Sequence, residues 1–160
     1  MKITAKEQSE FFCLIEEFTD NKLVLQMKNF IQHGNISTYE HCMKVAEISF
    51  SLNRKYKLKA DEKVLVTSCL LHDFYLYDWH EKSDSHKLHG FTHPSVAAKN
   101  AEMYFGIKGK TKRCISTHMW PLTITKIPTS REGWILCAVD KYCALTEVFN
   151  KKGGDSDVYQ

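Results

Sequence analysis

Six residues of this 160-residue sequence carry side chains suited to binding divalent metal ions: His41, His72, Asp73, His93, His118 and Asp140. Imidazole together with carboxylate suits iron, zinc, manganese or nickel. A single inward histidine or aspartate is more often structural than metal-binding, so no one of these residues defines a site. Their occurrence together, spaced along apolar helical segments, predicts a metal centre assembled from several helices. Such a centre indicates a metal-dependent enzyme of the hydrolase type.

The two aspartates lie in apolar surroundings. Asp140 ends the run Trp134–Asp140, and Asp73 follows the run Val64–Leu71. A buried carboxylate without a positive partner is very unfavourable. Lys141 is adjacent to Asp140 and points about 100° away around the helix, so it is not the natural partner. Taken singly, Asp73 is also compatible with a turn residue and Asp140 with a salt bridge. Taken together, they favour one or two divalent ions that compensate both carboxylates.

Helical periodicity predicts the elements that position these residues. The expected helices cover residues 9–19, 22–32, 37–56, 61–71, 94–105, 111–117 and 130–149. The third begins at a capping box, Ser37-Thr38-Tyr39-Glu40. Its apolar stripe includes His41, which therefore faces the core. Gly34 is expected to follow the second helix as its stop, and Gly106 the fifth.

Two features near residue 90 bear on the ligand set. Pro94 suits the first turn of a helix, which places His93 at a helix N-terminus, where the positive end of the dipole disfavours imidazolium. A neutral His93 is able to bind metal. His89 lies four residues earlier and is an alternative ligand.

The predicted fold class is all-α: a compact single-domain helical bundle of about six to eight helices covering residues 1–160. Its core spans about residues 37–149, with N-terminal helices in residues 1–36 packing on it and a polar tail at residues 150–160. Residues 122–127 alternate in polarity, but Pro121 and Pro128 flank them, so we expect an extended loop.

Composition excludes several classes of protein. Hydrophobic residues make up 43% of the chain, charged residues 26%, and the net charge is +3, so stable nucleic-acid binding is not expected. No secretory signal or membrane-spanning stretch is evident, so no membrane partner is expected. The six cysteines form no C-x-x-C pair and are expected to be free thiols of a cytoplasmic protein. The sequence leaves the oligomeric state open, and an oligomer is compatible with it.

The order of these residues, from about Ser37 to Phe149, resembles the HD-domain superfamily of metal-dependent phosphohydrolases. The superfamily's basic pattern of His, His-Asp and Asp corresponds to His41, His72-Asp73 and Asp140, which implies one metal ion. Members with two further histidines resemble two-metal phosphodiesterases, and His93 and His118 match that addition. The resemblance then implies an HD-type fold in which Asp73 bridges two ions.

The chain departs from the cyclic-dinucleotide branch of that superfamily. Leu76 stands where that branch has a lysine, Met119 where it usually has a second histidine, and a Gly-Tyr-Pro signature is absent. The segments His72–His80 and His118–Pro121 look like a small bacterial subgroup instead. Cyclic-dinucleotide activity is therefore not expected.

The resemblance implies a role for each residue. His41, His72 and Asp140 would hold one ion, and His93 and His118 the other, with His72 and Asp73 as the central catalytic pair. One or two ions of iron, manganese, zinc, nickel or magnesium would activate water for attack on phosphorus. The substrate would be a phosphorylated small molecule or nucleotide, and the candidate contacts are Lys44, Trp79, Lys87, Trp120 and Lys141.

Three other functions are compatible with the same residues. The first is a mononuclear nucleotidase, in which His93 and His118 contact substrate. The second is a metal-binding sensor module without turnover. The third is a di-iron oxygenase, because some HD-like folds carry out that chemistry with a similar ligand set.

Overall fold

The computed structural model describes residues 4–80 and 88–153. Within these ranges the chain forms seven α-helices, one short 3₁₀ helix and a two-stranded antiparallel sheet. The elements are α1 (Ala5–Thr19), α2 (Lys22–Gln26), η1 (Met27–Asn29), β1 (Ile31–His33), β2 (Ile36–Ser37), α3 (Thr38–Lys55), α4 (Glu62–Leu71), α5 (His89–Phe105), α6 (Gly109–Thr117) and α7 (Arg131–Gly153). The predicted all-α fold class and number of helices are confirmed.

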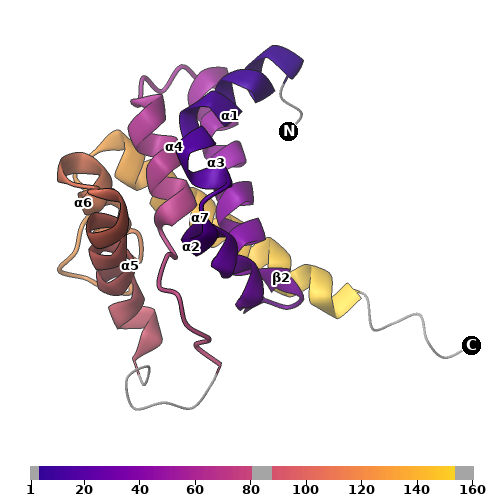
Figure 1. Cartoon of the computed structure of the whole chain (residues 1–160), viewed down its shortest axis with the longest axis vertical. Helices are drawn as coiled ribbons and strands as arrows, with labels where there is room; N and C mark the ends of the chain where they lie inside the picture. Colours follow the sequence, from indigo (N-terminus) through magenta and orange to yellow (C-terminus); the bar gives the residue numbers. More distant parts are fainter. Residues whose placement is uncertain (1–3, 81–87, 154–160) are drawn as a thin grey trace, which may run out of the picture.

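Helices α3, α4 and α7 form the centre of the bundle, because each of them packs on the other two. Helix α6 contacts α4 and α7 on one side, and α5 packs on α6 (Figure 1). Helix α1 covers α4 from the other side, and the β1–β2 hairpin lies against α3 and α7. This arrangement brings the ends of several helices to one region of the molecule.

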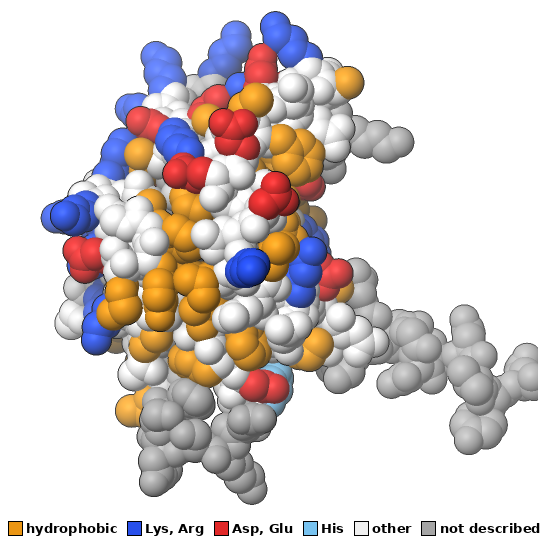
Figure 2. Space-filling view, in the orientation of Figure 1, with side chains coloured by type: hydrophobic (Ala, Val, Ile, Leu, Met, Phe, Trp, Pro, Cys, Tyr) orange, Lys and Arg blue, Asp and Glu red, His pale blue; other side chains and the backbone are white. Residues whose placement is uncertain are grey.

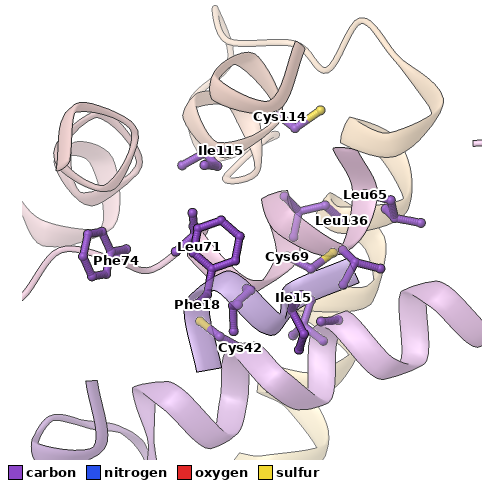
Figure 3. Close-up of a cluster of buried hydrophobic side chains, with 14 of the residues drawn as sticks. Ile15, Phe18, Cys42, Leu65, Cys69, Leu71, Phe74, Cys114, Ile115 and Leu136 are labelled. Atoms are coloured by element: carbon purple, nitrogen blue, oxygen red, sulfur yellow. The ribbon is translucent and has the colours of Figure 1, made fainter. Parts of the chain in front are cut away.

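All seven α-helices contribute side chains to the hydrophobic core, and Figure 3 shows part of it. Phe11 and Ile15 of α1 are fully buried, and Phe11 packs edge-on against Phe50 of α3 with ring centroids 5.5 Å apart. Phe18 makes a similar contact with Phe105 of α5 at 5.3 Å. The N-terminal helix therefore contributes to the same core as the later helices. All six cysteines are free, and five of them are buried.

Helix starts agree with the sequence where a side chain caps the helix. The capping box at α3 is confirmed, because the Ser37 hydroxyl accepts from the Glu40 amide and the Glu40 carboxylate accepts from the Ser37 amide. Asp61 caps α4 through the amide of Val64, at 3.0 Å. Helix α1 starts earlier than predicted, because Thr4 and Glu7 form a second capping box.

The prediction of a helix over residues 22–32 is wrong in its second half. Helix α2 ends at Gln26, and residues 31–37 form the β1–β2 hairpin. Gly34 has the expected positive φ of 62°, but it lies in the two-residue turn between His33 and Ile36 rather than after a helix. Apolar residues at helical spacing gave no sign of this hairpin, because its strands are too short to show alternation.

Helix α5 also differs from its prediction. It begins at His89, so Pro94 lies in the second turn and not the first. The carbonyl of Leu88 accepts from the amides of Phe91 and Thr92, which closes the first turn before the proline. His93 is therefore not at the N-terminus of the helix, so the prediction that the helix dipole keeps it neutral is wrong. Helix α6 begins two residues early, and α7 extends to Gly153. Residues 122–127 form a loop as predicted, but residues 122–125 are turns and a bend rather than extended chain.

The surface is mixed in charge on the face shown in Figure 2. Lys and Arg side chains alternate there with Asp and Glu over the upper part, and hydrophobic side chains gather in the middle and lower part. Within the described ranges, no helix combines the length and hydropathy needed to cross a membrane.

The turn between α3 and α4 is held by the side chain of one buried asparagine. The buried side chain of Asn53 accepts from the Ala60 amide at 3.0 Å and donates to the Ala60 carbonyl at 3.2 Å. Asn53→Ala leaves both main-chain groups without this partner, so we expect the free energy of unfolding in urea to fall by about 2–4 kcal/mol. Asn29→Ala, at an exposed position, is the control. A change below about 0.5 kcal/mol for Asn53→Ala would contradict the prediction.

Candidate metal centre

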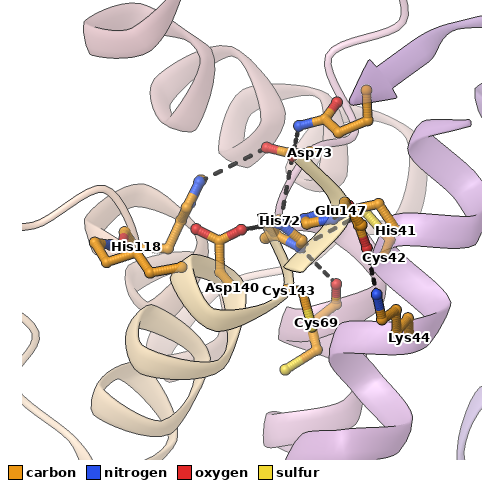
Figure 4. Close-up of polar contacts among 12 residues, drawn as sticks. His41, Cys42, Lys44, Cys69, His72, Asp73, His118, Asp140, Cys143 and Glu147 are labelled. Atoms are coloured by element: carbon orange, nitrogen blue, oxygen red, sulfur yellow. Dashed lines mark hydrogen bonds and ion pairs between the residues drawn. The ribbon is translucent and has the colours of Figure 1, made fainter. Parts of the chain in front are cut away.

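The six predicted ligands come together although they lie in, or directly after, five different helices. All are buried, with at most 7% of any of these residues exposed. His41 lies in the first turn of α3, His93 in the second turn of α5 and Asp140 in the middle of α7. His72 and His118 directly follow α4 and α6 as C-cap residues, and Asp73 follows His72. Figure 4 shows Asp140 between His72 and His118.

Three of the histidines have one ring nitrogen fixed by a main-chain carbonyl. The Nδ1 bonds are His72 to Cys69 at 2.7 Å, His93 to His89 at 2.8 Å and His118 to Ile115 at 2.7 Å. A carbonyl oxygen only accepts, so each Nδ1 carries the hydrogen and each neutral ring has its lone pair on Nε2. Metal-binding histidines in proteins are held in this way.

His41 is oriented by a carboxylate instead. Its Nδ1 donates to Glu147 of α7 at 2.8 Å, and the other Glu147 oxygen accepts from Lys44 at 3.0 Å. The Nε2 atom of His41 then faces Oδ1 of Asp140 at 3.1 Å. His41 is therefore aligned in the carboxylate–histidine arrangement that supports metal binding.

The Nε2 atoms converge on the two aspartates. Oδ1 of Asp140 lies 3.4 Å from His72 Nε2, in addition to its contact with His41. Oδ1 of Asp73 lies 3.2 Å from His93 Nε2 and 3.7 Å from His118 Nε2. The Nε2 atoms of His93 and His118 are only 3.0 Å apart. Two lone pairs at this distance repel unless a proton or a cation lies near them.

The donor atoms fit a divalent cation. Among the described residues, Nε2 of His72 and Oδ1 of Asp73 are buried without a hydrogen-bond partner, which is unfavourable unless something else satisfies them. Three ligand triads have donor atoms within 4.8 Å of one another. They are His41/His72/Asp73, Asp73/His93/His118 and His72/His118/Asp140. Mixed imidazole and carboxylate donors at this spacing suit transition-metal ions.

The charges of the cluster shift one another's pKa values. Burial lowers the pKa of His41, but hydrogen bonds to Asp140 and Glu147 outweigh it and raise that pKa to about 10. Burial raises the pKa of Asp140, yet the hydrogen bond from His41 and the nearby His72 ring hold it well below its usual range. Burial, together with His72 and His93, lowers the pKa of His118 to about 3. The cluster thus favours ionised carboxylates with positive charge beside them.

A pocket of about 660 Å³ opens onto the cluster. Its lining includes the ligand candidates Asp73, His93, His118 and Asp140 together with Gln32, Trp79, His89, Gly90, Met119, Pro121, Leu122, Lys141 and Ala144. A volume of this size suits a small-molecule ligand. The cluster is therefore buried from bulk solvent but reachable from the pocket.

Of the five candidate substrate contacts, two line the pocket. Trp79 and Lys141 line the pocket. Trp120 packs edge-on against Trp134, with ring centroids 5.0 Å apart, and is not part of the lining. Lys44 pairs with the carboxylate that orients His41, which points to support of that ring rather than contact with substrate. Lys87 lies outside the described residues.

The structure separates the two alternatives for the ligand on α5. His93 directs Nε2 at Asp73 and His118. The ring of His89 instead stacks on Trp79 with ring centroids 5.1 Å apart, and its Nδ1 lies 3.0 Å from the Tyr77 hydroxyl. His93 therefore joins the candidate ligands, and His89 supports it through its main-chain carbonyl and lines the pocket.

Sequence reasoning missed two residues that touch the ligands. Glu147 lies seven residues after Asp140 in α7, so the two share a helix face, and this spacing could have identified it. Gln32 donates to Oδ2 of Asp73 at 2.6 Å from strand β1. Nothing local could have identified Gln32, because the segment around it was predicted to be helical.

Comparison with known protein families matches residues 38–145 to the HD domain. The chain belongs to the HD-domain family. The match covers more than half of the chain and contains all six candidate ligands, whereas Gln32 and Glu147 lie outside it. Searches of curated proteins and of solved structures returned no match. This family is one of metal-dependent phosphohydrolases. The clustered histidines and aspartates are consistent with metal binding.

Removal of Asp73 tests the centre directly, because its carboxylate occurs in two of the three ligand triads. We expect Asp73→Ala to retain less than about 10% of the Mn²⁺ bound by the parent protein after dialysis, with its helical circular dichroism kept. Asp78→Ala, which removes a carboxylate paired with His80 outside the cluster, is the matched control. Parental metal content in Asp73→Ala would refute the assignment.

The pKa of His41 predicts how stability depends on pH. Its folded value of about 10 lies above the ordinary value of 6.5, so the stability it contributes is complete below pH 6.5 and is lost as pH rises toward 10. We expect the Tm of chelator-treated protein to fall over this range. Saturation with Mn²⁺ should reduce the fall, because the cation replaces the proton.

Glu147→Gln provides the matched comparison for this titration. It removes one of the two carboxylates that raise the pKa of His41, so the decrease in Tm should be smaller and should be complete at lower pH. A chelator-treated parent protein whose Tm stays constant between pH 6.5 and 9.5 would contradict the assignment, as measured by scanning calorimetry.

Proposed function

We propose that this protein is a metal-dependent phosphohydrolase that uses two divalent ions to hydrolyse a phosphate ester of a small molecule or nucleotide. The observation that supports this most strongly is the shared use of Asp73. Its carboxylate belongs both to the triad with His41 and His72 and to the triad with His93 and His118. A carboxylate shared between two groups of ligands is suited to bridging two ions.

The two oxygens of Asp73 face different groups. Oδ2 lies 3.4 Å from His72 Nε2, and Oδ1 lies 3.2 Å from His93 Nε2. His41, His72 and Asp140 would hold one ion on the Oδ2 side, and His93 and His118 the other on the Oδ1 side. A single ion would leave one of these groups without a cation near it, which favours the binuclear version over the mononuclear nucleotidase.

Divalent ions held in this way supply the hydrolytic chemistry, because they lower the pKa of coordinated water from about 15.7 toward 7 and stabilise negative charge on phosphoryl oxygens. The protein's contribution is positional. The fixed Nδ1 bonds of His72, His93 and His118 prevent the rings from rotating, so no reorganisation is needed during the reaction. Pro121 and Leu122 line the pocket, where apolar surface excludes water.

Charge balance supports an anionic substrate. Asp73 and Asp140 make the pocket floor negative, and Lys141 is the one Lys or Arg side chain in the described lining. Its Nζ donates to the His118 carbonyl at 3.0 Å, which holds its charge beside the cluster. Two divalent ions would turn this floor positive, and a phosphate group would then be attracted. Substrate binding should therefore require the metal.

The decisive experiment combines metal analysis with a hydrolysis panel. We expect gently purified protein, reconstituted with Mn²⁺, to hold about two ions per chain and to hydrolyse at least one of a phosphomonoester, a phosphodiester or a nucleotide. ³¹P relaxation should show inorganic phosphate binding to the Mn²⁺-loaded protein and not to the chelated protein.

Each outcome of this experiment selects one function. About one ion per chain with turnover would favour the mononuclear nucleotidase. Two ions without hydrolysis across the panel would overturn the phosphohydrolase proposal and favour the sensor module. Oxygen consumption by an iron-loaded, mixed-valent protein would point to the oxygenase.

A further inference from the structure

The carboxylate of Asp73 has a protein partner that comes from outside the segment matched to the HD domain. Gln32 of β1 donates from Nε2 to Oδ2 of Asp73 at 2.6 Å, across 41 residues of sequence. The residue is 7% exposed and lies in the lining of the pocket. The contact therefore links the N-terminal hairpin to the centre of the ligand cluster.

The amide of Gln32 is held in one orientation. Its Oε1 accepts from the hydroxyl of Tyr75, and the Thr38 hydroxyl lies 3.2 Å from the same oxygen. A reversed amide would place Oε1 against the Asp73 carboxylate, so two acceptors would face each other. The chain Tyr75–Gln32–Asp73 thus has a single favourable direction, with each group donating to the next.

This bond distinguishes the two oxygens of Asp73. Oδ2 accepts the hydrogen bond from Gln32 and also lies 3.4 Å from His72 Nε2. Oδ1 is buried without a hydrogen-bond partner among the described residues and faces His93 and His118. The carboxylate plane is fixed by the same bond. Without it, rotation of the Asp73 side chain would exchange the two oxygens and disturb both groups of ligands.

We propose that Gln32 is a positioning residue of the metal centre, which uses its amide N–H to fix Oδ2 of Asp73 so that Oδ1 is presented to the cation beside His93 and His118. This inference rests on the proposed metal-dependent function. It assigns the N-terminal hairpin a part in the site that the family segment alone does not provide.

The test uses Co²⁺ as the probe, because its visible absorption depends on the geometry of its ligands. Gln32→Met keeps the length of the side chain and removes the donor. We expect its Co²⁺ affinity, measured in competition with a chromogenic chelator, to fall about 10–100-fold. We also expect its visible spectrum to change. Tyr75→Phe leaves Asp73 untouched but frees the Gln32 amide, so it should show the same spectral change with a smaller loss of affinity.

Controls separate positioning from general stability. Gln26→Met makes the same substitution at an exposed position of α2 and should match the parent protein in affinity and spectrum. Far-ultraviolet circular dichroism and the Tm of metal-free protein establish that the variants are folded. Because the spectrum reports ligand geometry, a loss of stability alone would not change it.

The outcomes distinguish this inference from the function on which it rests. A parent protein that binds no Co²⁺ would overturn the metal centre itself. A parent that binds Co²⁺, with Gln32→Met and Tyr75→Phe unchanged in both affinity and spectrum, would overturn only the role of Gln32. Weaker binding with an altered spectrum in folded Gln32→Met would support it.

Discussion

Two buried carboxylates impose the constraint on which the rest of this structure depends. Asp73 and Asp140 lie at the centre of a helical bundle, with 2% and 7% of each residue exposed. An ionised carboxylate at such a position requires positive charge close to it. Imidazole groups meet this requirement in two ways: protonated, they carry the positive charge themselves, and neutral, they bind a cation that carries it. The cluster is therefore able to remain folded and also to bind metal.

Two helices end beside the ligand cluster, and their last carbonyl groups need hydrogen-bond donors. The last carbonyls of a helix lack partners within the helix. His72 and His118, as C-cap residues, donate Nδ1–H to carbonyls three residues earlier. One hydrogen bond thus satisfies the helix end and selects the tautomer whose Nε2 lone pair faces the aspartates. At α4 and α6, the hydrogen bond that ends the helix is therefore the one that orients the candidate ligand.

Support for the centre extends beyond the segment that defines the family. Glu147 orients His41 from the last turns of α7, and Gln32 contacts Asp73 from the hairpin before α3. Both lie outside residues 38–145. The family segment supplies the groups that would bind the ions, whereas the flanking segments fix the orientation of particular groups.

The sequence alone predicted the helical class and the capped start of α3, because these features are local in the chain. It also supplied the candidate histidines and aspartates. Only the tertiary structure decided between His89 and His93, which lie one turn apart on α5 and differ in what their rings contact. It also revealed the hairpin, Gln32 and Glu147, whose hydrogen bonds join residues 41 and 106 positions apart. Periodicity indicates which face of a helix is buried. It does not indicate which distant side chain meets that face, since that depends on how the helices pack.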